Sequence, residues 1–180
     1  MKETDTSVHT ILRERARQLA RPLVMTGDRD AAGAKAASVL VARLGDERAS
    51  IALDHIIEVY RAAQLTPIPG ARTPVVGVVA WRGRVLTVLD IAHSRSAPIA
   101  ITETTRIIVV GQRTPSFGIF ADEVDDVQDL NTQDAQTVAD IAPGRREFVR
   151  GVTADALVVL DAAALIARFA PIQQSTGLRE

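Results

Sequence analysis

Short apolar runs separated by turn residues fill most of the chain after about residue 37. They cover residues 39–44, 50–53, 56–60, 75–81, 84–89, 106–111, 117–121, 149–152 and 157–160. Runs of this length that are rich in Val, Ile and Leu and end at Gly, Pro or Asp are typical of strands. The pattern therefore predicts an all-β domain, with a break in regular structure at Pro67, Pro69 and Gly70.

Helical patterns occur only at the two ends. Apolar residues recur at three- and four-residue spacing from Val8 to Leu23, which predicts a helix over 8–21 followed by a small, polar linker. Near the other end, Asp161 can cap a short helix that Pro171 stops. We therefore expect an N-terminal helix and linker at 1–36, a β-rich domain at 37–170 and a flexible tail at 171–180.

Two connections stand out among the predicted strands. Arg82 and Gly83 alone separate the runs 75–81 and 84–89, a spacing that predicts a tight hairpin in which Gly83 takes positive φ. A longer polar stretch follows, with paired strand runs on both sides of it. We expect a boundary between two subdomains near residues 92–105.

Charge and composition narrow the possible partners. The 21 basic and 22 acidic residues leave a net charge of −1, which argues against nucleic acid and anionic lipid as ligands. The chain has no cysteine, so disulfides and thiolate chemistry are excluded. No apolar run is long enough to cross a bilayer and Met1 precedes a polar stretch, so we expect a cytoplasmic protein without direct membrane insertion.

The remaining candidates for chemistry are weak. Acidic residues cluster at 122–129, but they lack the alternation, Gly and final Glu of a calcium loop. His9, His55 and His93 are far apart in sequence and carry no hydrolase motif, and no phosphate-binding glycine motif is present. We expect no catalytic residue, metal or cofactor, although a small β-barrel enzyme stays as an alternative that a convergent polar pocket would reveal.

A longer series of residues resembles the CheW family of chemotaxis coupling proteins. It begins with an Ile-Ile-Glu-Val step at 56–59 and continues with Pro67, Pro69, Gly70, Gly77, Arg82, Gly83 and the Val-Leu-Asp step at 88–90. It resumes with Gly118, Ile119, the Asp-Glu-Val step at 122–124, Gly151, Val152 and residues 158–161. Each short motif is weak, but their order and spacing from about 37 to 169 identify the chain as a member of the family.

The resemblance implies a fold and a function. The family fold is two packed five-stranded SH3-like β-barrels, here flanked by the N-terminal helix and the short C-terminal helix. Such a module is a non-enzymatic adaptor that couples the cytoplasmic tips of methyl-accepting chemoreceptors to the regulatory domain of the histidine kinase CheA. An alternative within the family is a regulatory protein of a pilus or gliding pathway that competes for or sequesters the kinase.

Four residues are candidates for receptor binding. Arg82 matches the family arginine implicated in that contact, and the alternative is an ordinary solvated turn residue. Ile56 belongs either to an apolar receptor groove or to the core. Trp81 either fills the core or takes part in an exposed contact, because its ring combines apolar area with a polar edge. Arg106, at the start of the run 106–111, is the fourth.

Overall fold

The computed structural model describes residues 36–61, 64–92, 94–131, 135–136 and 145–170, which fold mainly as strands. In chain order the elements are β1 (Ala36–Leu44), β2 (Glu47–Ala52), the 3₁₀ helix η1 (Leu53–His55), β3 (Ile56–Tyr60), β4 (Val75–Trp81), β5 (Arg84–Leu89), β6 (Arg106–Gly111), β7 (Pro115–Ala121), β8 (Glu123–Asn131), β9 (Val149–Val152), β10 (Leu157–Leu160) and α2 (Ala162–Phe169). The β-rich class and the short C-terminal helix are confirmed. The helix predicted over 8–21 and the tail at 171–180 lie outside the described residues.

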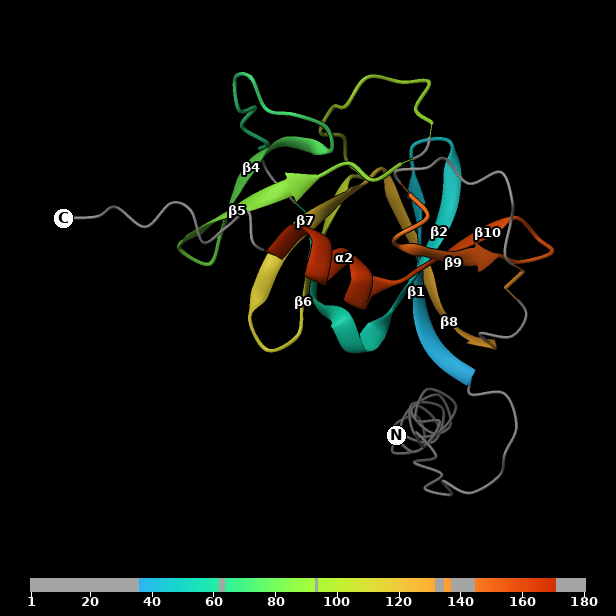
Figure 1. Ribbon diagram of the computed structural model, residues 1–180. Coiled ribbons are helices and arrows are strands. Elements are labelled where there is room, and N and C mark those ends of the chain that lie inside the picture. The colour runs from blue at the N-terminus through green and yellow to red at the C-terminus, as the bar shows by residue number, and fades with distance from the viewer. Residues whose placement is uncertain (1–35, 62–63, 93, 132–134, 137–144, 171–180) are drawn as a thin grey trace, which may run out of the picture. The chain divides into compact units, whose positions relative to one another are not determined.

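The strands form two five-stranded sheets, as the SH3-like fold predicts (Figure 1). The first sheet has the order β8-β1-β2-β10-β9 and the second has the order β3-β6-β7-β5-β4. Most neighbouring strands are antiparallel, but β10 runs parallel to β2 and β5 runs parallel to β7. These two parallel pairs join strands that are far apart in the sequence.

The chain passes between the sheets at places other than the one we expected. The segment at 92–105 connects β5 to β6, and both strands belong to the second sheet. The crossings occur at η1, between β2 and β3, and at Asp122, between β7 and β8. The expected boundary near 92–105 is therefore wrong as a crossing point: the first sheet takes strands from both ends of the domain, so sequence order does not separate the subdomains.

The main core lies between the two sheets. Leu40 and Ile51 of the first sheet pack there with Ile108 and Phe117 of the second, and Phe169 of α2 is part of the same cluster. On β6, Ile108 and Val110 face this shared core while Ile107 and Val109 face a separate core inside the second sheet. β6 is therefore buried on both faces. For this reason its sequence is a continuous apolar run and not an alternation of apolar and polar residues.

The sequence pattern did not predict strand β8. β8 contains four acidic residues and follows a fifth, Asp122, and acidic residues are uncommon in strands. The structure nevertheless pairs β8 with β1 along most of its length, with a register shift between Leu40 and Ala42. β8 is an edge strand of the first sheet, where charged side chains remain in solvent and deter unwanted pairing.

Candidate functional site

The hairpin between β4 and β5 turns at Arg82 and Gly83, as predicted. Both residues have positive φ, 46° for Arg82 and 76° for Gly83, the values of a two-residue turn that matches the twist of its strands. This conformation suits glycine but costs an arginine side chain roughly 1–2 kcal/mol. An arginine is therefore held here against the preference of the backbone.

Glu58 on β3 links the hairpin to the opposite edge of the same sheet. One carboxylate oxygen, Glu58 Oε2, accepts a hydrogen bond of 2.9 Å from Trp81 Nε1 and lies 2.9 Å from Arg82 Nη2. The Arg82 guanidinium also lies over the Trp81 ring, 5.2 Å from its centroid. We call these three residues the hairpin cluster. β3 and β4 are the two edge strands of the second sheet, so this contact draws its edges together.

The members of the hairpin cluster differ sharply in exposure. The Trp81 residue is only 9% exposed and packs in the core of the second sheet, whereas the Arg82 side chain is 69% exposed. A buried indole normally needs a partner for its N–H group, and Glu58 supplies it. The cluster therefore presents one guanidinium to solvent on a base that is anchored in the core.

Two aliphatic side chains on β5 and β3 are exposed at the surface of the second sheet. Val85, which follows Arg84 on β5, is 70% exposed, and Ile57, which precedes Glu58 on β3, is 37% exposed. Tyr60, further along β3, packs against the core of the second sheet, and its burial, with a smaller effect of the Glu58 charge, raises the pKa of its hydroxyl. Arginine and apolar side chains are both common at protein interfaces.

The other two predicted site residues lie in different surroundings. Ile56 is half-buried on β3 and packs against the core between the sheets. Arg106, at the start of β6, donates from Nη1 to the carbonyl oxygens of Glu103 at 2.8 Å and Thr105 at 2.9 Å. Its guanidinium thus stabilises the loop that precedes β6.

Glu58 was missed as a site residue. It is the only charged residue in the apolar run 56–60, and an isolated acid in a predicted strand was the signal available. The sequence could not show that Glu58 lies close to Arg82. β3 and β4 are opposite edge strands, and only the curvature of the sheet brings them together.

A second ion cluster joins the two sheets. Arg95 donates from Nε to Asp90 Oδ2 at 2.7 Å and from Nη1 to Asp122 Oδ1 at 2.7 Å, and only 12% of its side chain is exposed. Asp122 Oδ2 also accepts from the amide of Gly45 at 2.7 Å. Hydrogen bonds to Asp90, and secondarily to Asp122, raise the pKa of Arg95 above its ordinary value despite its burial. We call Asp90, Arg95 and Asp122 the inter-sheet clasp.

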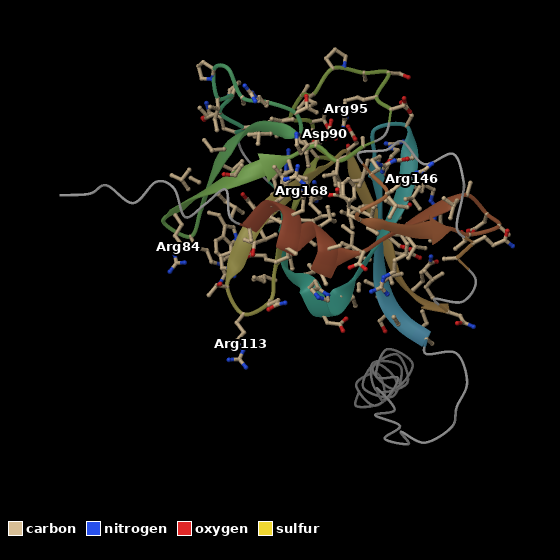
Figure 2. All side chains as sticks on the ribbon, in the orientation of Figure 1. Arg84, Asp90, Arg95, Arg113, Arg146 and Arg168 are labelled. Atoms are coloured by element: carbon tan, nitrogen blue, oxygen red, sulfur yellow. The ribbon has the colours of Figure 1, made fainter. Side chains whose placement is uncertain are left out.

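The clasp holds one loop of the second sheet against the β1–β2 turn of the first. Ser94 O accepts a hydrogen bond of 3.1 Å from the amide of Asp46. Gly45 has φ of 63°, and a side chain there would bring its Cβ to 2.2 Å from Ser94 O. Glycine is required at this position for both reasons. Figure 2 shows the Asp90 and Arg95 side chains next to each other.

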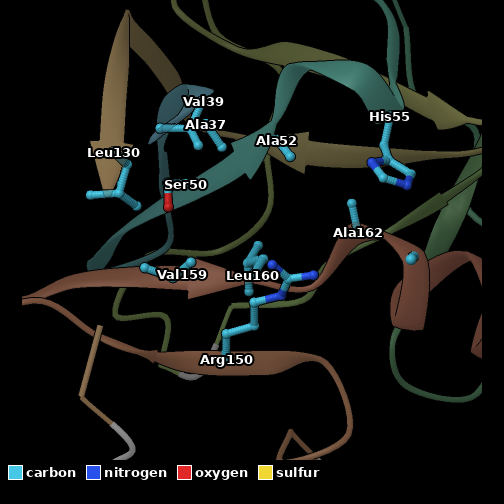
Figure 3. Close-up of a pocket in the computed structure, with 11 residues that line it drawn as sticks. Ala37, Val39, Ser50, Ala52, His55, Leu130, Arg150, Val159, Leu160 and Ala162 are labelled. Carbon is cyan, nitrogen blue, oxygen red and sulfur yellow. The ribbon is translucent and has the colours of Figure 1, made fainter. Parts of the chain in front are cut away.

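A small pocket beside the first sheet holds the one described histidine. It has a volume of about 40 Å³ and lies among His55, Ser50, Arg150 and neighbouring apolar residues (Figure 3). The buried Nδ1 atom of His55 has no hydrogen-bond partner. His9 and His93 lie outside the described residues. A space of this size suits about one water molecule and not a substrate.

Other chemistry is not organised in the described part of the chain. Within it, no group of three or more His, Asp or Glu side chains is arranged to hold a metal ion. The acidic residues of β8 instead pair along the sheet surface, for example Glu123 with Arg43 at 2.7 Å and Asp125 with Arg48 at 3.2 Å. No helix in the described ranges has the length and apolar character needed to cross a bilayer.

Comparison with known protein families gives one match that covers most of the chain. Residues 38–170 match the family model described as the CheW-like domain. This range begins within β1 and ends just after α2, so it contains both sheets, the hairpin cluster and the inter-sheet clasp.

Individual relatives agree with this match. The chain is 31% identical over 114 residues to the chemotaxis protein CheW of Rhizobium meliloti (strain 1021), covering 62% of this chain and 74% of that protein. It is 37% identical over 83 residues to protein FrzA of Myxococcus xanthus, covering 46% of this chain and 52% of that protein. Among solved structures, the scaffolding protein TtCheW from Thermoanaerobacter tengcongensis aligns over 70% of this chain and 89% of its own, with a TM-score of 0.56 and 20% identity, which supports the fold.

Proposed function

Because the chain belongs to the CheW-like domain family, we propose that it is a non-enzymatic adaptor that couples methyl-accepting chemoreceptors to the histidine kinase CheA. The observation that carries the proposal is the hairpin cluster, which holds an exposed Arg82 at positive φ on a buried base. A residue kept in a costly conformation without a gain for the fold is a candidate for function.

The geometry suits recognition of a protein surface. Arg82 offers several planar N–H donors, and contacts to Glu58 and the Trp81 ring restrict its orientation before binding. A side chain that is already ordered loses less entropy when it binds. We propose that Arg82 donates to polar or acidic groups at the cytoplasmic tip of a receptor.

The remaining site residues have separate proposed roles. Ile56 contributes to the apolar side of the receptor contact through its half-exposed surface, next to the exposed Ile57. Trp81 and Glu58 position Arg82 without contacting the receptor directly. We retain Arg106 as a receptor-binding candidate at the edge of the interface, although its hydrogen bonds serve the adjoining loop.

The second partner follows from family membership. We propose that the chain binds the regulatory domain of CheA and is recruited from the cytoplasm to receptor arrays at the membrane. Its two five-stranded sheets share an apolar core and are joined by the inter-sheet clasp, so a single domain offers surfaces to two partners.

Reconstitution tests the proposal. Purified chain is added to membranes that contain receptors from the native cell together with its CheA, and kinase autophosphorylation is measured. We expect activation only when receptor, kinase and this chain are all present. Inhibition of kinase that another coupling protein has already activated would instead identify the chain as a competitor for the kinase, and activation without receptor would contradict the proposal.

A further inference from the structure

The two sheets carry opposite net charges, which the near-zero total conceals. Residues 53–121 form the second sheet and its loops, and they contain seven arginines and four acidic residues. The strands of the first sheet and α2 lie within 36–52, 122–131 and 145–170, which together contain six arginines and ten acidic residues. A chain with a net charge of −1 thus presents a basic sheet and an acidic sheet to its partners.

The arginines of the second sheet differ in how their charges are used. Arg95 is held in the inter-sheet clasp, Arg106 donates to two carbonyl oxygens, and Arg82 belongs to the hairpin cluster. The guanidinium groups of Arg84 and Arg113, in contrast, have no ion-pair or hydrogen-bond partner among the described residues, and both residues are exposed. Their charges are therefore available to a partner.

Arg84 lies beside the hairpin cluster. Only Gly83 separates it from Arg82, and it pairs with Trp81 where β5 begins. Trp81 is itself bonded to Glu58 on β3. The contacts of the cluster therefore place Arg84 at the end of the second sheet where the hairpin meets β3.

The β6–β7 turn approaches β3 at the same end of the sheet. A Cβ atom added at Gly111 would lie 2.8 Å from Ile57 Cδ1, and Ile57 directly precedes Glu58. This turn carries Arg113. Figure 2 shows Arg84 and Arg113 on one side of the domain, with both side chains directed away from it.

Few acidic residues oppose the charges at this end. Glu58 is already shared by Trp81 and Arg82. The other acids of the second sheet outside the clasp are Asp54 on η1 and Glu103 in the loop before β6, and both are exposed. Even with both counted, the second sheet keeps its excess of arginine. We name three exposed arginines the basic end: Arg82, Arg84 and Arg113.

We propose that the basic end steers the chain onto an acidic patch of the receptor tip, an inference that rests on the function proposed above. Arg82 is the short-range anchor, while Arg84 and Arg113 raise the rate of encounter. Complementary charges at the rim of an interface act mainly on the association rate, and salt screens them. A membrane surface or a nucleic acid is disfavoured because its charge is extended and would also face the acidic first sheet.

Association kinetics test the proposal. The full chain is mixed with the purified cytoplasmic fragment of a receptor from the native cell, and the association rate constant is measured between about 30 and about 500 mM NaCl. We expect this rate constant to fall at least about tenfold as salt rises, and the dissociation rate constant to change less than about twofold. An association rate that is independent of salt would overturn the proposal without requiring any variant.

Paired charge reversals locate the effect. Arg84→Glu with Arg113→Glu should lower the association rate constant about tenfold at low salt and have little effect at high salt. Arg61→Glu with Arg72→Glu is the matched control, because both residues are exposed, lie away from the β4–β5 and β6–β7 turns and change the net charge equally. We expect less than about a threefold effect in this control. Equal losses in the two double variants would overturn the basic end as the steering surface.

A second probe separates this inference from the proposed function. Acetylated and amidated hexaglutamate, with hexaglutamine as the uncharged control, is titrated into the full chain while arginine Nε–H signals are followed by NMR. We expect hexaglutamate alone to shift the signals of Arg84 and Arg113. Receptor binding without salt dependence and without these shifts would overturn the basic end and leave the adaptor function standing.

Two further outcomes concern the partner. Shifts with hexaglutamate but no binding of the receptor fragment would support the basic end and overturn the receptor as its partner. Vesicles of phosphatidylglycerol and a DNA duplex are tested in the same buffer. Tighter binding of either one than of the receptor fragment, lost in Arg84→Glu with Arg113→Glu, would overturn the acidic protein surface in favour of that polyanion.

Discussion

The indole nitrogen of Trp81 donates a 2.9 Å hydrogen bond to Glu58 Oε2, and this contact joins the two edge strands of the second sheet. The same oxygen atom lies 2.9 Å from Arg82 Nη2. A single carboxylate thus satisfies a core residue and orients a surface residue. Changes to the three side chains should therefore separate stability from partner binding.

Arg82→Ala should leave the fold nearly unchanged and impair receptor coupling. The side chain is 69% exposed, and surface changes of this kind usually alter the free energy of unfolding by no more than about 0.5 kcal/mol. Loss of an interface arginine commonly costs about 2 kcal/mol of binding free energy, which is more than tenfold in affinity. Urea denaturation and receptor-dependent kinase activation measure the two effects. Arg84→Ala on the same hairpin is the control, and equal loss in both variants would show a general charge effect.

Arg82→Asn should stabilise the hairpin while receptor coupling is lost. Asparagine tolerates positive φ far better than arginine does, so part of the roughly 1–2 kcal/mol cost of this conformation is recovered. Thermal unfolding should move to higher temperature while kinase activation falls as in Arg82→Ala. A variant that retains full activation would indicate that the turn, and not the guanidinium, is what the partner recognises.

Trp81→Phe should cost both stability and orientation of Arg82. The phenyl ring fills most of the same core space but offers no N–H group to Glu58, so we expect a loss of about 1 kcal/mol for the hydrogen bond plus a packing term. Trp81→Ala should cost about 3–5 kcal/mol because it leaves a cavity. Trp81 is the only tryptophan, so unfolding has to be followed by circular dichroism in both variants.

Arg95→Gln should be among the most destabilising charge removals in the domain. It leaves the carboxylates of Asp90 and Asp122 without their shared cation at a site where only 12% of the arginine is exposed, and breaking such a buried arrangement costs about 3–5 kcal/mol. Urea denaturation measures the loss. Arg43→Gln removes a pair with Glu123 in which both side chains are about half exposed, so its effect should stay within about 1 kcal/mol.

Acid should weaken the cap of α2. Partial burial opposes ionisation of Asp161, but hydrogen bonds from the Ala164 amide and from Arg150 outweigh it and hold the pKa of Asp161 below its usual value. Its contribution is therefore fully present above about pH 4 and is lost as the pH falls through the lowered pKa. Asp161→Asn, which keeps the capping oxygen, should be less stable at neutral pH by at most about 1 kcal/mol, since solvent screens the charge. The difference should vanish at low pH, and a difference independent of pH would contradict this account.

Local sequence determined several features of this domain directly. The Arg82–Gly83 spacing predicted the hairpin and Asp161 predicted the start of α2. The apolar runs 106–111 and 117–121, on both sides of a turn expected to contain Pro115, predicted that β6 pairs with β7, although Pro115 itself is the first residue of β7. Each depends on residues that are neighbours in the chain, where backbone preferences and short hydrogen bonds decide the outcome.

Only the tertiary structure decided which distant strands share a sheet. The parallel pairing of β10 with β2, the inclusion of β8 in the first sheet and the crossing at η1 depend on how two sheets with apolar faces cover each other. Apolar periodicity identifies a buried face but not the surface that buries it. Arg82 could be identified from the sequence because its position in a two-residue turn is a local feature. Its contact with Glu58 and the ion pairs of Arg95 could not, because sheet curvature and packing bring together residues that are distant in the sequence.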